Sequence, residues 1–136
     1  MQKMTTVFVV EDSALVRRRI AESIEAAAGC EVVGVAESED QAFAAIERLR
    51  PAIIVADIQL KQGSGMGVLQ RVRAQGNSPR PYIIMLSNYA ASDYKEHAMA
   101  GGADAVFDKT SEYAEFLRVL ENRATAGVTG PATGAS

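Results

Sequence analysis

The sequence has one cysteine, no tryptophan and only four prolines among its 136 residues. The single cysteine, Cys30, cannot form a disulfide within the chain or build a cluster of thiolate ligands. A disulfide-stapled fold and a cysteine-rich zinc site are therefore excluded, and a reducing compartment is the simplest expectation. We expect Cys30 to be buried beside a strand rather than to be reactive.

Long apolar runs are also absent. No segment approaches the ~20 apolar residues of a membrane span, and residues 1–6 lack the charged and apolar regions of a signal peptide. With 14 basic and 17 acidic residues, the net charge of −3 gives no sign of nucleic-acid binding. The one basic run, the three arginines at 17–19, fits a solvated helix face. We expect a cytoplasmic protein that neither inserts into a membrane nor binds nucleic acid directly.

Short apolar runs alternate with helical patterns along most of the chain. The predicted strands are residues 6–10, 31–36, 52–56, 82–86 and 105–107, the second at a sheet edge. This alternation is typical of a parallel sheet with helices on both faces. We predict an α/β fold, a doubly wound five-stranded parallel sheet of order 2-1-3-4-5 in a flavodoxin-like three-layer sandwich.

Helix boundaries carry recognisable signals. Ser13 precedes one helical stripe, and Ser38 stands three residues before Gln41, the spacing of a capping box. Gly29 should end the first helix, and either Thr110 or Ser111 should cap the last. Residues 1–123 should form one domain, whereas 124–136 carry no charge and no periodicity, so we predict a disordered tail there.

Polar residues follow four of the predicted strands at their carboxyl ends. Glu11 and Asp12 follow the first, Asp57 the third, Ser87 the fourth and Lys109 the fifth. In a 2-1-3-4-5 sheet these ends form one crevice, with the three carboxylates beside the switch point. Two like charges ~4 Å apart repel by about 4 kcal/mol at an effective dielectric near 20, so a cation must offset them. Oxygen ligands suit Mg²⁺ (or Mn²⁺).

The same residues suit phosphoryl transfer, in which catalysis consists mostly of positioning the group and neutralising its charge. A metal, Lys109 and the Ser87 hydroxyl would each take one phosphoryl oxygen, with Asp57 as the nucleophile that forms an acyl phosphate. On its own, Asp57 would more simply cap a strand or bind a loop amide. Its four partners favour the chemical role.

These motifs resemble the receiver domain of two-component response regulators over about residues 5–123. The resemblance is carried by Glu11-Asp12, Asp57, Ser87 in the sequence MLSN, and GADAVFDK at 102–109. It implies a phosphorelay protein that accepts a phosphoryl group on Asp57 from a phosphohistidine of a histidine kinase or histidine phosphotransfer protein. Such a receiver is no enzyme toward other substrates, since it catalyses only its own phosphorylation and slow dephosphorylation.

The resemblance also implies roles for the site residues. Glu11, Asp12, Asp57 and the backbone carbonyl of Gln59 would bind the metal. Ser87 and Lys109 would contact the phosphoryl group, and the surface of the fourth helix, fifth strand and fifth helix would contact a downstream protein. Dimerisation through that surface, the identity of the kinase and target, and whether the chain is a fragment stay open. We expect no output domain within it.

Several positions depart from the family pattern. Lys61 and Thr110 stand where proline is frequent, the second usually after a cis bond, and a cis bond without proline costs ~3 kcal/mol. The switch aromatic is replaced by Val106, and Phe107 should point to the opposite face of the strand. Coupling of Ser87 to an aromatic is therefore in question.

The two residues that follow Ser87 also depart from the family pattern. Asn88 and Tyr89 follow it where many members have a small residue first, and we expect them to crowd the phosphoryl site and slow hydrolysis.

Three other functions compete. A haloacid-dehalogenase-like phosphatase would carry its nucleophile on the first strand and its acidic pair late, the reverse of the order here. A flavodoxin-like electron carrier would need an anion-binding first loop, which Glu11 and Asp12 would repel. A receiver-like module that binds partners without phosphate is disfavoured because unused buried charges are costly.

Overall fold

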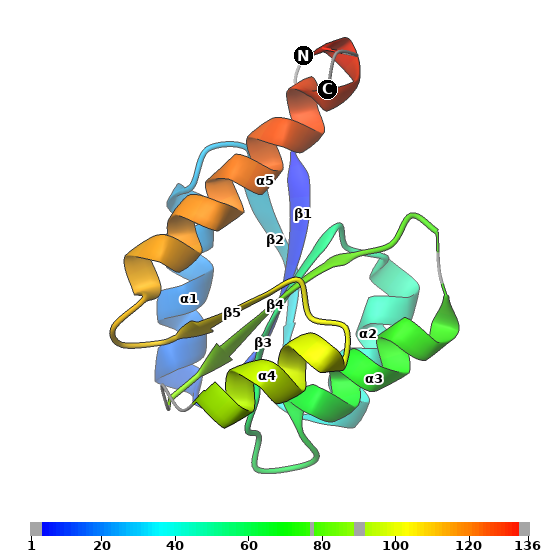
Figure 1. Cartoon of the computed structure of the whole chain (residues 1–136), viewed down its shortest axis with the longest axis vertical. Helices are drawn as coiled ribbons and strands as arrows, with labels where there is room; N and C mark the ends of the chain where they lie inside the picture. The colour runs from blue at the N-terminus through cyan, green and yellow to red at the C-terminus, as the bar shows by residue number, and fades with distance from the viewer. Residues whose placement is uncertain (1–3, 77, 89–91, 134–136) are drawn as a thin grey trace.

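The computed structural model describes residues 4–76, 78–88 and 92–133, with side chains at 92–93 and 126–133 left aside (Figure 1). Five strands alternate with five helices in this part of the chain. They are β1 (Thr5–Val10), α1 (Ala14–Ala26), β2 (Cys30–Ala36), α2 (Glu39–Leu49), β3 (Ile53–Asp57), α3 (Gly65–Gln75), β4 (Tyr82–Ser87), α4 (Ser92–Ala100), β5 (Ala105–Asp108) and α5 (Tyr113–Thr133).

The strands form one parallel sheet in the order β2-β1-β3-β4-β5. This order confirms the predicted doubly wound fold and places β2 at an edge. Alternation along β1 sends Val7 and Val9 to one face of the sheet and Phe8 and Val10 to the other. The first face packs against α1 and α5, and the second against α2, α3 and α4 (Figure 1).

The predicted helix starts at the two serines are confirmed. The Ser13 hydroxyl accepts a hydrogen bond from the N–H of Val16, and that of Ser38 accepts one from the N–H of Gln41. Gly29 was predicted to end the first helix, but α1 ends two residues earlier, with Ala27 as its C-cap. Gly29 lies in the turn that follows, with φ +81°. Strand β2 begins directly after Gly29, at Cys30.

Helix α5 also differs from its prediction at both ends. Before it, the Asp108 carboxylate accepts hydrogen bonds from the N–H groups of Thr110 and Ser111, so an acid holds the turn that leads to the helix start at Tyr113. At the other end the helix continues to Thr133, where a disordered tail was predicted from residue 124. Ala124 is fully buried and extends the apolar stripe of Phe116 and Leu120, which explains why the helix does not stop at 123.

Cys30 is buried, as expected. Among the described residues, no helix has the length and hydrophobicity to cross a membrane.

Candidate functional site

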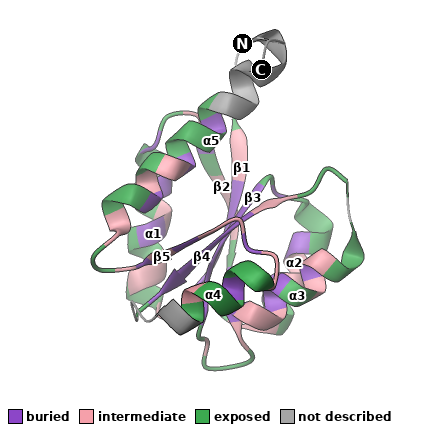
Figure 2. Cartoon of the chain, viewed as in Figure 1, coloured by how far each residue is buried: buried purple, intermediate pink, exposed green. Residues whose placement is uncertain are grey.

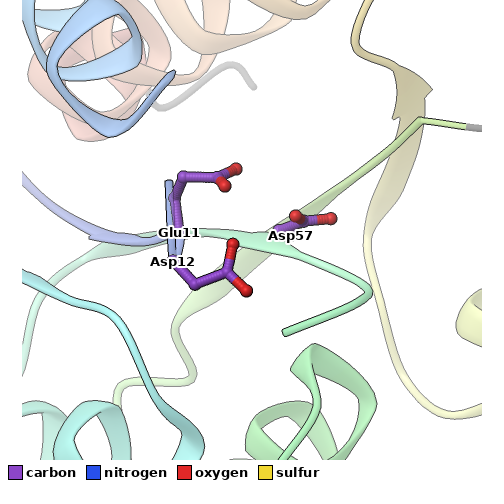
Figure 3. A group of neighbouring side chains, drawn as sticks. All are labelled: Glu11, Asp12 and Asp57. Carbon is purple, nitrogen blue, oxygen red and sulfur yellow. The ribbon is translucent and has the colours of Figure 1, made fainter. Parts of the chain in front are cut away.

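Three carboxylates meet where β1 and β3 end (Figure 3). Glu11, Asp12 and Asp57 each offer an oxygen within 4.8 Å of the others. They line a cavity of about 320 Å³, to which Asn88 and Lys109 also contribute. Glu11 is 2% and Asp57 4% exposed, so two of the three charges are almost removed from water.

Lys109 neutralises part of this charge. Its Nζ lies 2.6 Å from Glu11 Oε1 and 2.9 Å from Asp57 Oδ2, and its side chain is 11% exposed. Burial lowers the pKa of Lys109, but the two carboxylates outweigh burial and leave that pKa above its ordinary value. Burial raises the pKa of Glu11, and the charge of Asp57 raises it further against the opposing bond from Lys109.

Each carboxylate is also oriented by a backbone N–H. Glu11 Oε2 accepts from Ser13 at 3.0 Å, and Asp57 Oδ1 accepts from Gln59 at 3.2 Å. Asp12 Oδ2 accepts from Lys61 at 2.6 Å, the sole hydrogen bond to Asp12 among the described residues. A proline at 61 could not donate this bond. The departure at Lys61 therefore has a structural consequence that the sequence did not reveal.

The loop from β3 to α3 is hydrogen-bonded to the start of α2. The Glu39 carboxylate accepts from the N–H of Ser64 at 3.0 Å, and Arg71 pairs with it at 3.2 Å. Side chains at Gly63 or Gly67 would collide with Glu39. A Cβ at Gly65 would collide with the carbonyl oxygen of Asp57. The loop that carries Gln59 and Lys61 is thus held by close backbone packing.

Ser87 and its neighbours lie at the next strand. Ser87 is 3% exposed at the end of β4, and Leu86 before it pairs with Asp57. Asn88 is exposed at the cavity. Tyr89 lies outside the described residues, so its expected role stays a prediction.

The two positions on β5 face opposite ways, as strand alternation predicts. Val106 packs in the core on the side of α4, while Phe107 lies on the side of α5, with its ring centroid 6.4 Å from that of Phe116. The Lys109–Thr110 bond is trans; among the described residues the cis peptide bond is that before Pro79.

Four contacts between side chains have no sequence signal. Gln59 Nε2 donates to the Tyr94 hydroxyl at 3.0 Å, and Lys95 Nζ lies 3.1 Å from the Glu112 carboxylate. Asp104 pairs with Arg73 and Arg80. Their partners are distant in sequence, so only the tertiary structure brings them together.

The donor set fits a divalent cation. Carboxylate oxygens are the ligands that hard cations prefer, and the three here gather within the reach of one ion. A cation bound there would offset the repulsion between the buried carboxylates.

A comparison with protein families matches residues 7–121 to the response regulator receiver domain. Among curated proteins, the chain is 33% identical over 110 residues to protein-glutamate methylesterase/protein-glutamine glutaminase 1 of Syntrophus aciditrophicus, covering 79% of this chain and 31% of that protein. It is 27% identical over 143 residues to the DNA-binding transcriptional activator DevR/DosR of Mycobacterium tuberculosis, covering 98% and 65%. The chain therefore spans less than two thirds of these relatives.

Solved structures agree on the fold. A LuxR-family response regulator from Aurantimonas sp. SI85-9A1 superposes with a TM-score of 0.82 at 22% identity, covering 91% of this chain and 87% of that one. The response regulator domain of Thermotoga maritima CheB gives 0.77 at 21% identity, covering 93% and 98%. With the family match over nearly the whole domain, the chain belongs to the receiver domains of two-component response regulators.

Proposed function

We propose that this receiver accepts a phosphoryl group on Asp57. The observation that carries the proposal is the Asp57 carboxylate itself. It lies at the cavity, 4% exposed, with Lys109 Nζ at 2.9 Å and two further acids close by. A carboxylate oxygen attacks phosphorus, the bond from phosphorus to the donor's histidine nitrogen breaks, and that imidazole keeps the electron pair and takes a proton. Water later attacks the phosphorus of the acyl phosphate, releasing phosphate and restoring the carboxylate.

The neighbouring residues have separate roles in this proposal. Glu11, Asp12, Asp57 and the Gln59 carbonyl would hold Mg²⁺ or Mn²⁺, which when bound supplies positive charge against the phosphoryl oxygens. Lys109 Nζ, already 2.9 Å from Asp57, would bind a second oxygen. Ser87, at the end of the adjacent strand, would bind a third through its hydroxyl.

The partners follow from this chemistry. The donor would be a histidine kinase or histidine phosphotransfer protein in the cytoplasm, and the output would be a protein that binds the surface of α4, β5 and α5. The methylesterase and DNA-binding names belong to longer relatives, so neither activity is assigned to this chain. Membership in the receiver family leaves a phosphate-independent binding module as the remaining alternative.

Intact mass distinguishes these two functions. After incubation with Mg²⁺ and a small phosphodonor such as acetyl phosphate, the protein should gain one phosphoryl group. The adduct should be absent from Asp57→Asn and from samples treated with a chelator. An unmodified wild type that also fails to bind beryllofluoride, a mimic of the phosphoryl group, would favour the binding module.

A second expected result concerns Lys61, whose N–H alone orients Asp12 among the described contacts. Lys61→Pro removes that N–H and should weaken Mg²⁺ binding about tenfold, the scale of lost outer-shell bonds. Lys61→Ala keeps the N–H and should bind nearly as the wild type does, because its exposed charge is screened. Calorimetric titration without phosphodonor measures both. Equal affinities in the proline variant and the wild type would show that Asp12 needs no such support.

A further inference from the structure

The loop from β3 to α3 carries two groups of the candidate metal site but has little apolar anchorage. The N–H groups of Gln59 and Lys61 donate to two of the three site carboxylates. Figure 2 shows the loop mostly exposed, and within residues 59–63 it is Leu60 that packs against the core. Because little apolar surface fixes this loop, its position depends on polar contacts.

The loop closes on itself at its base. Gln59 and Ser64 form an antiparallel β-bridge, and the N–H of Gly65 donates to the carbonyl oxygen of Ile58 at 2.9 Å. Since bridged residues keep a fixed separation, a contact that holds Ser64 also holds Gln59. The loop therefore takes one position as a unit, which a single external contact can set.

Glu39, the first residue of α2, contacts this unit through its backbone and its side chain. Its N–H donates to the carbonyl oxygen of Gln62 at 3.1 Å, and its carboxylate accepts from the N–H of Ser64 at 3.0 Å. The carboxylate also occupies the space that a Cβ at Gly67, in the first turn of α3, would need. A helix N-terminus favours an anion there, and a charged acceptor strengthens the bond from Ser64.

Arg71, one turn further along α3, pairs with Glu39 and with the acid beside it. Its Nη1 lies 3.2 Å from Glu39 Oε2 and 2.8 Å from Asp40 Oδ1. The Glu39 side chain is 22% exposed, whereas that of Asp40 is 92% exposed. Among the contacts of the described residues, Asp40 has none to the loop. The two acids thus share a charge and an ion-pair partner, and they differ in reaching the loop.

We propose that Glu39 is a positioning residue for the metal site, acting through Ser64 and the loop. The inference rests on the proposed function and deepens it. Through Ser64, Glu39 fixes the carbonyl of Gln59, a proposed ligand. Through the same loop it fixes the N–H of Lys61, which orients Asp12. Without this contact the loop must be ordered when the cation binds, and that ordering lowers the affinity.

Two substitutions at Glu39 separate the length of the side chain from its charge. Glu39→Asp keeps the charge but withdraws the carboxylate from the Ser64 N–H by one methylene. It should weaken Mg²⁺ binding about three- to tenfold, at and below the low end of the range for lost outer-shell partners, because Glu39 acts through the loop. Glu39→Gln loses the charge but keeps an oxygen within reach of that N–H, so it should bind Mg²⁺ within about twofold of the wild type.

Calorimetric titration of the full chain with Mg²⁺, without phosphodonor, measures these affinities, and circular dichroism confirms that each variant is folded. Asp40→Asn is the matched control, since it removes a neighbouring charge with the same Arg71 partner, and it should bind Mg²⁺ within about twofold of the wild type. In Glu39→Asp, the Mg²⁺ concentration for half-maximal phosphoryl uptake should rise by the same factor as the dissociation constant. The rate at saturating Mg²⁺ should stay near that of the wild type, a split that a loss of stability alone would not produce.

The outcomes separate this inference from the proposed function. If the wild type takes up a phosphoryl group with Mg²⁺ but Glu39→Asp binds Mg²⁺ equally tightly, the positioning role is wrong and the proposed function stands. A loss in Glu39→Gln or Asp40→Asn as large as that in Glu39→Asp would attribute the effect to charge and would also overturn the positioning role. If the wild type neither binds Mg²⁺ nor takes up a phosphoryl group, the proposed function is overturned, and the positioning role with it.

Discussion

Replacement of Lys109 by methionine should lower the free energy of unfolding by about 3–5 kcal/mol at neutral pH without metal. Methionine fills a similar volume but removes the Lys109 ammonium, which lies within 3 Å of both Glu11 and Asp57, whose side chains are 2% and 5% exposed. Loss of one partner from a buried ion pair leaves an uncompensated charge, which is the costly case. Denaturant titration monitored by circular dichroism measures the change.

This deficit should depend on pH and metal. Burial already raises the folded-state pKa of Glu11, and without Lys109 that pKa should rise further. A carboxyl with a raised folded-state pKa binds more protons folded than unfolded between the two pKa values, so stability falls as pH rises through that window. The deficit should therefore shrink in mild acid, and Mg²⁺ should also reduce it by binding the folded state.

The matched control is Lys95→Met. That lysine belongs to an ion pair whose side chains are 39% and 28% exposed, and such pairs contribute about 0–1 kcal/mol. A similar loss in both variants would mean that burial of the Lys109 site does not determine its energetics.

Gly65→Ala should be the second large change, with a loss of about 1–3 kcal/mol. A Cβ there would collide with the Asp57 carbonyl oxygen and lie 2.8 Å from its carbonyl carbon and 3.0 Å from Ile58 Cα. All three are backbone atoms at the strand end that carries Asp57, the proposed phosphoacceptor, so none can turn away as a side chain can. The strand end or α3 must shift, and phosphorylation of Asp57 should slow as well.

Gly101→Ala controls for the loss of a glycine. Its Cβ would meet the flexible ends of Met66 and Leu69 at 3.2 and 3.3 Å, so the cost should stay below about 1 kcal/mol. Thermal unfolding of both variants and their rates of phosphoryl uptake provide the comparison. Equal stability of the two variants would show that the backbone at the end of β3 can shift to accommodate a Cβ at Gly65.

The sheet and the meeting of the acids were predictable because both depend on strong local signals. Strand β3 is apolar throughout and ends on Asp57, and the order of a doubly wound sheet then places the end of β1 beside it. Lys109 follows from the same rule at the end of β5. Parallel topology thus converts a one-dimensional pattern into a three-dimensional site.

What was missed depends on contacts between distant residues. The N–H of Lys61 reaches Asp12 across 49 positions, and Gln59 reaches Tyr94 across 35. Neither pair has a spacing that a helix or strand repeat would mark. Helix α5 extends past its prediction for a related reason. The burial of Ala124 depends on the sheet beneath it, whereas the prediction rested on the local absence of charge and periodicity.

Reductive trapping of the modified residue tests the central claim most directly. An acyl phosphate is reduced by borohydride to the alcohol, which would convert a phosphorylated aspartate into homoserine. After treatment with Mg²⁺ and acetyl phosphate, peptide mass spectrometry should find homoserine at position 57 in the wild type and at no other acid. Unreduced Asp57 in a protein that carries the phosphoryl mass would contradict the account. So would homoserine at Asp12, or 2-amino-5-hydroxyvaleric acid, the alcohol that glutamate gives, at Glu11.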